Sequence, residues 1–218
     1  MSEKKIIAVN GGTGNLGGAL AKRLAKAGYK VIIGSRSAES AQKAAAEIGH
    51  GAEGKQNADA AAAADLIIVS VPFAAQEATL RDIAPHAKGK IVVETTVPLV
   101  PPKVMRVQMP AEGSAAQRAQ AILGDGVTMV SAFHNVAAHK LEQDIDVGCD
   151  VLVFGDEKAA RAEVIKLAEA VGLRGIHAGA LANSAAAEAL TSILIFINKN
   201  YAVDGAGIKI TGDLKEPS

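Results

Sequence analysis

The chain has 218 residues, with 23 basic and 23 acidic side chains and a formal net charge of zero. This length suits one domain, or one domain with an extension, and it is enough to bury a substantial core. The balanced charge does not favour binding to nucleic acid or to an anionic membrane, and a single cysteine, Cys149, excludes a disulfide within the chain. Residues 1–5 lack the apolar stretch of a signal peptide, and no uninterrupted apolar run reaches transmembrane length, so we expect a soluble cytoplasmic protein.

Short runs rich in valine and isoleucine alternate with alanine-rich stretches along the chain. The runs predict six strands, at 5–10, 31–34, 66–71, 90–95, 127–132 and 150–154. Two weaker strands are predicted near 51–55 and 175–177. The stretches between them predict helices at 15–27, 38–48, 58–64, 74–84, 114–123, 157–171 and 182–200. Apolar strands with helical crossovers are typical of a parallel sheet covered on both faces. The sequence therefore predicts an α/β fold, a doubly wound parallel sheet of Rossmann type with a small C-terminal helical or αβ extension.

The first predicted strand runs into a glycine-rich segment at 11–17. Three of its glycines fit the pattern G-x-G-x-x-G, with a strand before them and an amphipathic helix after them. Such a loop lets a pyrophosphate approach the backbone, where the free N–H groups of the first helical turn point at the anion. The residues expected to bind a dinucleotide are Gly12, Thr13, Gly14, Asn15, Leu16 and Gly17. The alternatives are a glycine-rich turn without a ligand and, for Thr13 and Asn15, capping of the helix.

The end of the second predicted strand indicates which dinucleotide binds. An NAD site places an acidic residue there to bind the ribose hydroxyls. This chain instead has Ser35, Arg36 and Ser37, which offer two hydroxyl groups and a fixed cationic fork that suits a phosphate. We therefore predict NADP(H) as the cofactor, the alternative being that Arg36 is a solvated loop residue.

Four of the seven prolines, Pro98, Pro101, Pro102 and Pro110, follow the strand predicted at 90–95. This segment cannot form a regular helix or a central strand. Because ligands bind at the carboxyl ends of strands in such sheets, the segment is either a loop over the site or a rigid connector.

Standard catalytic patterns are missing from the sequence. It has no nucleotide-hydrolysis loop, no G-x-S-x-G elbow and no H-E-x-x-H, and neither Tyr29 nor Tyr201 is followed by a lysine four residues later. His134 and His139 are five residues apart and do not share a helical face, so no metal site is predicted. Without an obvious general base other than His134, the sequence favours hydride transfer between two redox carriers over alcohol oxidation.

Several strings along nearly the whole chain point to one family. They lie at 11–17, 34–36, 71–73, 90–93, 130–134, 155–156 and 178–184, followed by Glu188, Leu190 and Thr191. These strings resemble the NADP-dependent reductases of coenzyme F420, an 8-hydroxy-5-deazaflavin, and the order of the motifs is kept.

The resemblance implies an oxidoreductase that moves a hydride between the nicotinamide C4 of NADP(H) and the C5 of the deazaflavin co-substrate. It implies an NADP-binding Rossmann domain at 1–155 and an extension at 156–218 that completes the substrate pocket and contributes to a homodimer. The NADP positions are Thr13, Ser35 and Arg36. Val71 and Pro72 are also expected to bind the cofactor, and Phe73, Val97 and Pro98 are expected to pack near the nicotinamide. The deazaflavin positions are His134, Val136, Ser184 and Thr191, with His134 orienting the ring.

The sequence departs from the family at three places. Phe73 stands where relatives often have tryptophan, the segment 98–113 is unusually rich in proline, and the tail after Lys209 is longer and more polar. These departures leave open another heterocyclic substrate, such as a pterin or an imine. A non-catalytic NADP sensor is also open, because Gly11, Gly14 and Gly17 fit G-x-x-G-x-x-G.

Overall fold

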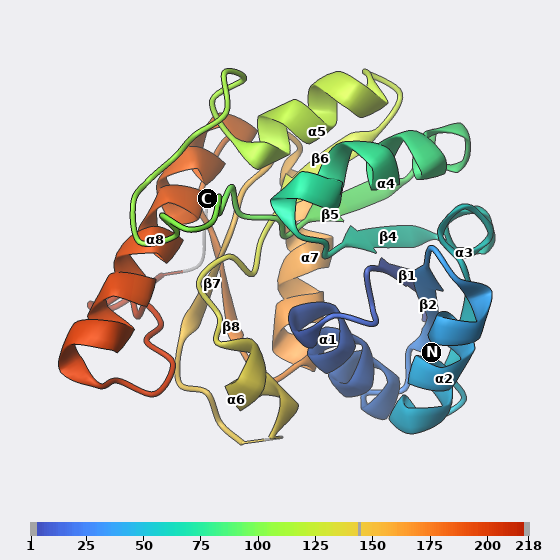
Figure 1. Ribbon diagram of the computed structural model, residues 1–218, viewed down its shortest axis with the longest axis horizontal. Coiled ribbons are helices and arrows are strands. Elements are labelled where there is room, and N and C mark those ends of the chain that lie inside the picture. The colour runs from blue at the N-terminus through green and yellow to red at the C-terminus, as the bar shows by residue number, and fades with distance from the viewer. Residues whose placement is uncertain (1–3, 144, 216–218) are drawn as a thin grey trace.

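The computed structural model describes residues 4–143 and 145–215. Its main sheet is parallel, with the strand order β3-β2-β1-β4-β5-β6 (Figure 1). The strands are β1 (Ile6–Asn10), β2 (Lys30–Ser35), β3 (Glu53–Gln56), β4 (Leu66–Val69), β5 (Ile91–Glu94) and β6 (Thr128–Ser131). This is the strand order of the Rossmann fold, so the predicted fold class is confirmed.

Helices cover both faces of the sheet because alternate strand residues point to opposite sides. Ile7 and Val9 pack in one core with α1 (Asn15–Lys26), α2 (Ala38–Ile48) and α7 (Lys158–Ala170). Ala8 and Ile67 pack in the other core with α3 (Asn57–Ala63), α4 (Phe73–Ala87) and α5 (Ala115–Leu123). Burial on both sides is the reason why the strands read as nearly continuous apolar runs.

A second, two-stranded parallel sheet pairs β7 (Asp150–Val153) with β8 (Arg174–His177). It joins the main sheet through an antiparallel bridge, in which the Ser131 and Phe154 backbones exchange hydrogen bonds of 2.8 and 2.9 Å. β7 lies before residue 155 and β8 after it, so this sheet draws on both sides of the predicted domain division. The division at 155 itself stays a prediction.

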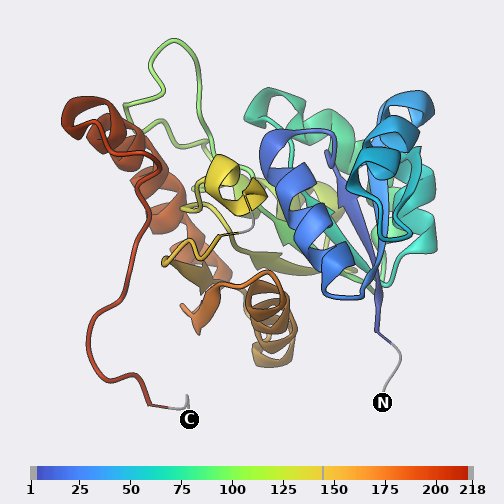
Figure 2. The same cartoon turned by 90° about the horizontal axis from the view of Figure 1, so that it is seen from below.

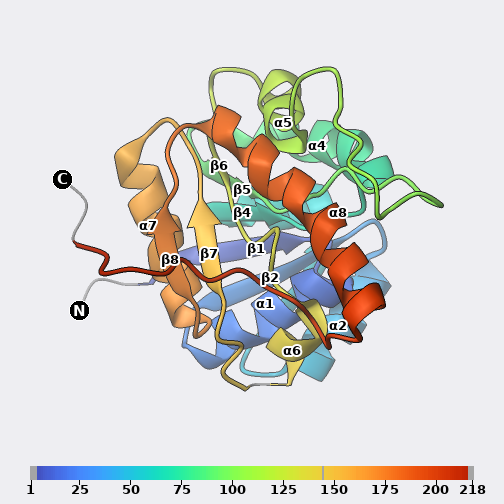
Figure 3. The same ribbon diagram turned by 90° about the vertical axis from the view of Figure 1, so that its left-hand side faces the viewer.

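The C-terminal part of the chain is a short 3₁₀ turn, η1 (Leu181–Asn183), a long helix, α8 (Ser184–Tyr201), and a tail (Figures 2 and 3). The tail runs back to β7, where Asp150 N–H donates to the Ile208 carbonyl at 2.8 Å and Ile210 N–H donates to the Asp150 carboxylate at 2.6 Å. Arg174 completes this attachment with two 2.7 Å hydrogen bonds to the Asp150 carboxylate, and they lower its pKa.

Helix α8 is long and apolar enough to cross a membrane by length and composition alone. Its buried side, however, carries Ser184, Glu188 and Ser192, each of which hydrogen-bonds to another part of the protein. These polar contacts are those of a helix that packs on a protein core.

Several element bounds differ from the predicted ones, such as β4, which ends at Val69 and not at residue 71, and α8, which begins at Ser184 after a 3₁₀ turn. The helix predicted to end at residue 84 continues to Ala87, with Pro85 in its last turn, where the missing N–H costs a single hydrogen bond. Helix α6 (Ala138–Glu142) was not predicted, because five residues carry too little periodicity to be recognised. It packs against α1.

Candidate functional site

The glycine loop joins β1 to α1 where β1 has β2 on one side and β4 on the other. Gly11 has a φ of 87°, and a Cβ atom there would lie 2.2 Å from the Ser70 carbonyl oxygen. A Cβ on Gly17 would lie 2.5 Å from the Gly11 carbonyl oxygen. Only glycines therefore let β1, the loop and α1 approach each other this closely at the switch point of the sheet.

The first turn of α1 offers N–H groups to a ligand. Gly14 is the N-cap, and no side-chain capping hydrogen bond is formed there. The alternative that Thr13 or Asn15 caps this helix is therefore wrong, because neither side chain accepts from its N–H groups. Uncapped N–H groups at a helix start favour an anion such as a pyrophosphate.

A groove of about 240 Å³ opens at the carboxyl ends of β1, β2 and β4. None of its lining residues is acidic; they are Gly11, Thr13, Gly14, Ser35, Arg36, Asn57, Ser70, Val71, Pro72, Ala75 and Thr79. The groove thus brings together six residues predicted to bind the cofactor. Exposed Arg36 and half-buried Ser35 at the end of β2 fit a dinucleotide with a phosphate on its adenosine ribose.

Four of the other predicted cofactor residues lie around this groove in different settings. Gly12 and Asn15 line a second hollow of about 230 Å³ that they share with Thr13 and Gly14. Leu16 packs against the core, and Ser37 caps α2 by accepting from Ser40 N–H at 3.3 Å. Their contacts with a cofactor stay a prediction.

Phe73, Val97 and Pro98 surround the turn that follows β4. The Thr96 hydroxyl donates to the Val71 carbonyl at 3.2 Å, which ties the end of β5 to this turn. The Arg118 guanidinium lies 5.1 Å from the centre of the Phe73 ring. The predicted nicotinamide neighbours therefore lie on two connected segments after the carboxyl ends of β4 and β5, with Phe73 as the first residue of α4, and their role stays a prediction.

A separate cavity of about 180 Å³ lies between the segment after β6 and α8. His134, Val136 and Thr191, three of the four predicted deazaflavin residues, are among its lining residues. The Thr191 hydroxyl donates to the His134 carbonyl at 3.0 Å, and this bond holds α8 against the segment. Ser184 lies apart from the cavity lining, because its hydroxyl is fully buried and donates to Ser114 Oγ at 3.0 Å.

His134 is a neutral group in this cavity wall. Only 6% of the side chain is exposed, and burial lowers its pKa to about 3. Its Nε2 shares a 2.7 Å hydrogen bond with Ser131 Oγ. The preceding residue, Phe133, has a φ of 67°, a strained conformation for a bulky side chain. His134 is thus suited to hydrogen bonding rather than to carrying charge.

Three buried polar residues near the site were given no role by the sequence analysis, although Glu188 belongs to the strings that carry the resemblance. Asn10 ends β1, and its amide donates to the Asn57 carbonyl at 3.0 Å beside the groove. Glu94 ends β5, and Glu188 lies on α8; both are almost fully buried. The sequence did carry a signal for Asn10 and Glu94, because each is a polar residue at the end of an apolar strand.

Larger cavities occur elsewhere. One of about 320 Å³ involves Lys5 and Tyr29 near the amino end of β1, and one of about 310 Å³ involves Arg23 and Gly172. We place the site in the groove because ligands of parallel sheets bind at the carboxyl ends of the strands. Among the described residues, no group of three or more His, Cys, Asp or Glu side chains could hold a metal ion.

The glycine loop at the switch point and the groove beside Arg36 define a dinucleotide-binding protein of the Rossmann class. Residues 6–98 match the sequence model of a family described as NADP oxidoreductase, coenzyme F420-dependent. The chain is 41% identical over 218 residues to the F420-dependent NADP reductase of Methanothermobacter thermautotrophicus, and the alignment covers 94% of each chain. It is 41% identical over 220 residues to the enzyme of the same name from Methanocaldococcus jannaschii, covering 94% and 97% of the two chains. The chain belongs to the family of F420-dependent NADP reductases.

A solved structure supports this assignment. A candidate F420-dependent NADP-reductase from Arthrobacter superposes on the protein with a TM-score of 0.80 and 25% sequence identity. The match covers 95% of this chain and 99% of that one. The family resemblance predicted from the sequence is confirmed over nearly the whole chain.

Proposed function

We propose that the protein is an oxidoreductase that transfers a hydride between NADP(H) and coenzyme F420. The observation that carries this proposal is the 41% identity to F420-dependent NADP reductases over 94% of the chain. The groove supports it, because it joins a helix start without a side-chain cap to Arg36 and Ser35 at the end of β2. A cytoplasmic location is part of the proposal, and it suits a chain whose one cysteine, Cys149, is free and buried.

In this proposal the groove holds NADP(H), and the cavity beside α8 holds the deazaflavin. Thr13 and the start of α1 bind the pyrophosphate, while Ser35 and Arg36 bind the ribose phosphate. The two carriers supply the redox chemistry, and the protein aligns them and excludes water. His134, Val136 and Thr191 are proposed for the deazaflavin, with neutral His134 orienting its ring through a hydrogen bond, whereas buried Ser184 is left out because it bonds Ser114.

Stopped-flow mixing of the protein with NADPH and oxidised coenzyme F420 tests the proposal directly. We expect the visible band of the oxidised deazaflavin to disappear at a rate that depends on protein concentration. NADH serves as the comparison, and it should react more slowly because it lacks the phosphate that Arg36 is placed to bind. Tight binding of NADPH without any loss of the band would contradict the function and favour a sensor.

We also propose that the protein forms a homodimer, as the sequence resemblance implies. Helix α8 supports this, because Ile193 and Phe196 leave 47% and 49% of their surface exposed on a long apolar helix. Light scattering should give a mass of twice the 22.2 kDa chain. A mass of 22.2 kDa at assay concentrations would reject the dimer without affecting the proposed reaction.

A further inference from the structure

The proline-rich loop, residues 97–114, connects β5 to α5 and extends beside α8 (Figures 1 and 3). Its first residues follow Thr96, which is bonded to the turn at the edge of the groove. Its middle is held to α8 by Ser192, whose hydroxyl donates to the Arg106 carbonyl at 3.3 Å. The loop therefore spans the distance between the dinucleotide groove and the helix that lines the second cavity.

A buried carboxyl group holds the beginning of this loop. Glu94 has no exposed surface, and its Oε1 accepts a hydrogen bond from Thr96 N–H at 2.9 Å. Its Oε2 has no hydrogen-bond partner among the residues that the structure describes. Burial of an oxygen without a donor favours the protonated acid over the carboxylate.

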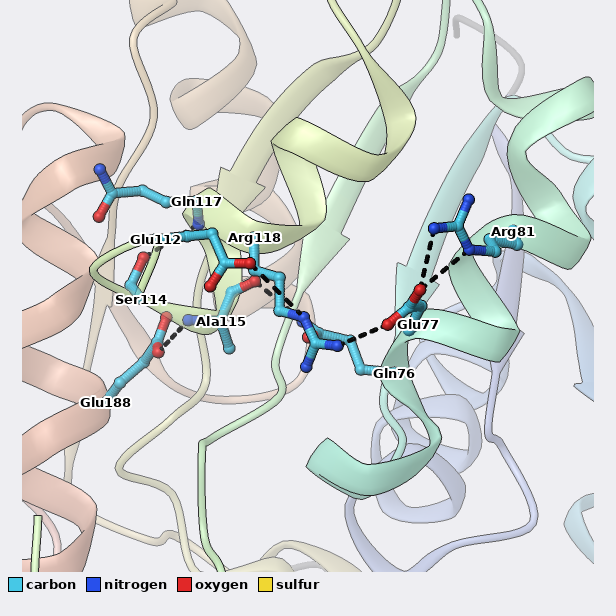
Figure 4. Close-up of polar contacts among 9 residues, drawn as sticks. All are labelled: Gln76, Glu77, Arg81, Glu112, Ser114, Ala115, Gln117, Arg118 and Glu188. Carbon is cyan, nitrogen blue, oxygen red and sulfur yellow. Dashed lines mark hydrogen bonds and ion pairs between the residues drawn. The ribbon is translucent and has the colours of Figure 1, made fainter. Parts of the chain in front are cut away.

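A second buried carboxyl group holds the end of the loop. Glu188 reaches from α8 to the start of α5, where its two oxygens accept from Ala115 N–H at 2.6 Å and Ala116 N–H at 3.1 Å (Figure 4). The Ser184 hydroxyl adds a bond to Ser114, the residue that caps α5. Only 1% of Glu188 is exposed, so these bonds are closed to solvent.

Gln76, a buried residue of α4, also holds the end of the loop. Its amide nitrogen donates to the Ala115 carbonyl at 2.9 Å, and its side chain acts to lower the pKa of Glu94. Ala115 thus contacts Gln76 through its carbonyl oxygen and Glu188 through its N–H. The end of the loop is therefore held by buried polar contacts from both α4 and α8.

No basic residue on the neighbouring elements is seen to neutralise this pair within the described part of the chain. Arg118 on α5 points toward α4, where it binds Glu77 at 2.7 Å, and its other acidic neighbour is Glu112 at 4.0 Å (Figure 4). Burial is the main reason why the pKa values of Glu94 and Glu188 are raised to about 7, and the Glu94 charge contributes to the rise at Glu188. Near neutral pH, one proton within the pair avoids two like charges in a buried space.

We propose that Glu94 and Glu188 are positioning residues that fasten both ends of the 97–114 loop between the groove edge and α8, and that a proton held by this pair keeps the loop in this position. The link to catalysis depends on the proposed function, because it assumes that the loop closes over the hydride acceptor. The fastened loop binds this proton more tightly than an open loop with solvated carboxyl groups, whose pKa values are ordinary. A rise in pH past neutrality therefore favours the open loop.

Hydrogen exchange of the intact protein measures the fastening without reference to activity. At about pH 8, wild-type peptides from 97–116 should lose several-fold more protection than at about pH 6, after correction for intrinsic exchange. Glu94→Gln and Glu188→Gln should each weaken this pH dependence, and the double variant should remove most of it, because an amide does not titrate. Glu169→Gln, which changes an exposed carboxyl group on α7, should behave as wild type. If both single variants keep the wild-type pH dependence, the proposal is wrong.

Steady-state kinetics then test the positioning role. In the wild type, the KM for oxidised coenzyme F420 should rise about threefold or more over the same pH interval, with a smaller change in kcat. Glu188→Gln should flatten this KM profile and raise the KM at the lower pH, because one N–H of α5 loses its acceptor. A flat wild-type KM profile would overturn the role in positioning. If the wild type shows no turnover, the proposed function fails, while hydrogen exchange still decides whether the pair fastens the loop.

Discussion

Replacing Arg23 by alanine is expected to lower the free energy of unfolding by about 3 kcal/mol. Arg23 lies on the buried side of α1, and its guanidinium donates to three backbone carbonyls, those of Leu141 at 2.6 Å, Ile145 at 2.8 Å and Val171 at 2.8 Å. These acceptors lie in α6, in the segment after it and at the end of α7. One side chain therefore joins the first helix of the main sheet to the later half of the chain, and its loss leaves three carbonyls without this donor.

Denaturant unfolding followed by circular dichroism measures this effect, with Lys22→Ala as the matched control. Lys22 is the exposed neighbour of Arg23 on the same helix, so its loss should change stability by less than about 0.5 kcal/mol. Arg23→Lys should recover only part of the loss, because an ammonium group lacks the planar fork that reaches several acceptors at once. A loss below about 1 kcal/mol for Arg23→Ala would show that water replaces the guanidinium at these carbonyls.

The main sheet could be predicted, and so could the part of the groove formed by the glycine loop and the end of β2. In both cases a short segment of the sequence carries the signal. Buried parallel strands such as β4 read as unbroken apolar runs, and a G-x-G-x-x-G segment between a strand and a helix is typical of a dinucleotide-binding loop. Ser35 and Arg36 could be assigned to the groove because β1 and β2 are adjacent parallel strands. Their carboxyl ends, and the residues that follow, must then meet at the same edge of the sheet.

The remaining features depend on contacts between distant segments. The run at 150–154 looks like any other buried strand, and nothing local shows that β7 pairs with β8. Arg23 reads as an ordinary polar residue of an amphipathic helix, since its acceptors are carbonyls more than 100 positions away. Glu188 belongs to the strings that carry the family resemblance, but its partners at the start of α5 follow only from the fold. The sequence thus predicts which chemistry the strand ends carry, and tertiary packing decides which polar residues hold the loops around it.

Replacing Arg36 by alanine should remove most of the preference for NADPH over NADH. Arg36 is exposed at the rim of the groove, and no acidic residue is among the groove's lining residues. A charge-assisted pair with the ribose phosphate contributes about 2 kcal/mol, so the Kd of NADPH should rise about thirtyfold. The Kd of NADH should stay nearly unchanged, because NADH has no phosphate at this position.

Fluorescence titration of both nucleotides with the wild type and the variant decides this assignment. Lys43→Ala is the matched control, since it removes an exposed positive charge from α2 without touching the groove lining. Equal losses of NADPH affinity in Lys43→Ala and Arg36→Ala would show that Arg36 acts only through general electrostatic attraction, which falls with added salt. Equal losses for NADPH and NADH in Arg36→Ala would place the side chain at the pyrophosphate instead. Only a loss confined to NADPH assigns Arg36 to the ribose phosphate, because this group alone distinguishes the two nucleotides.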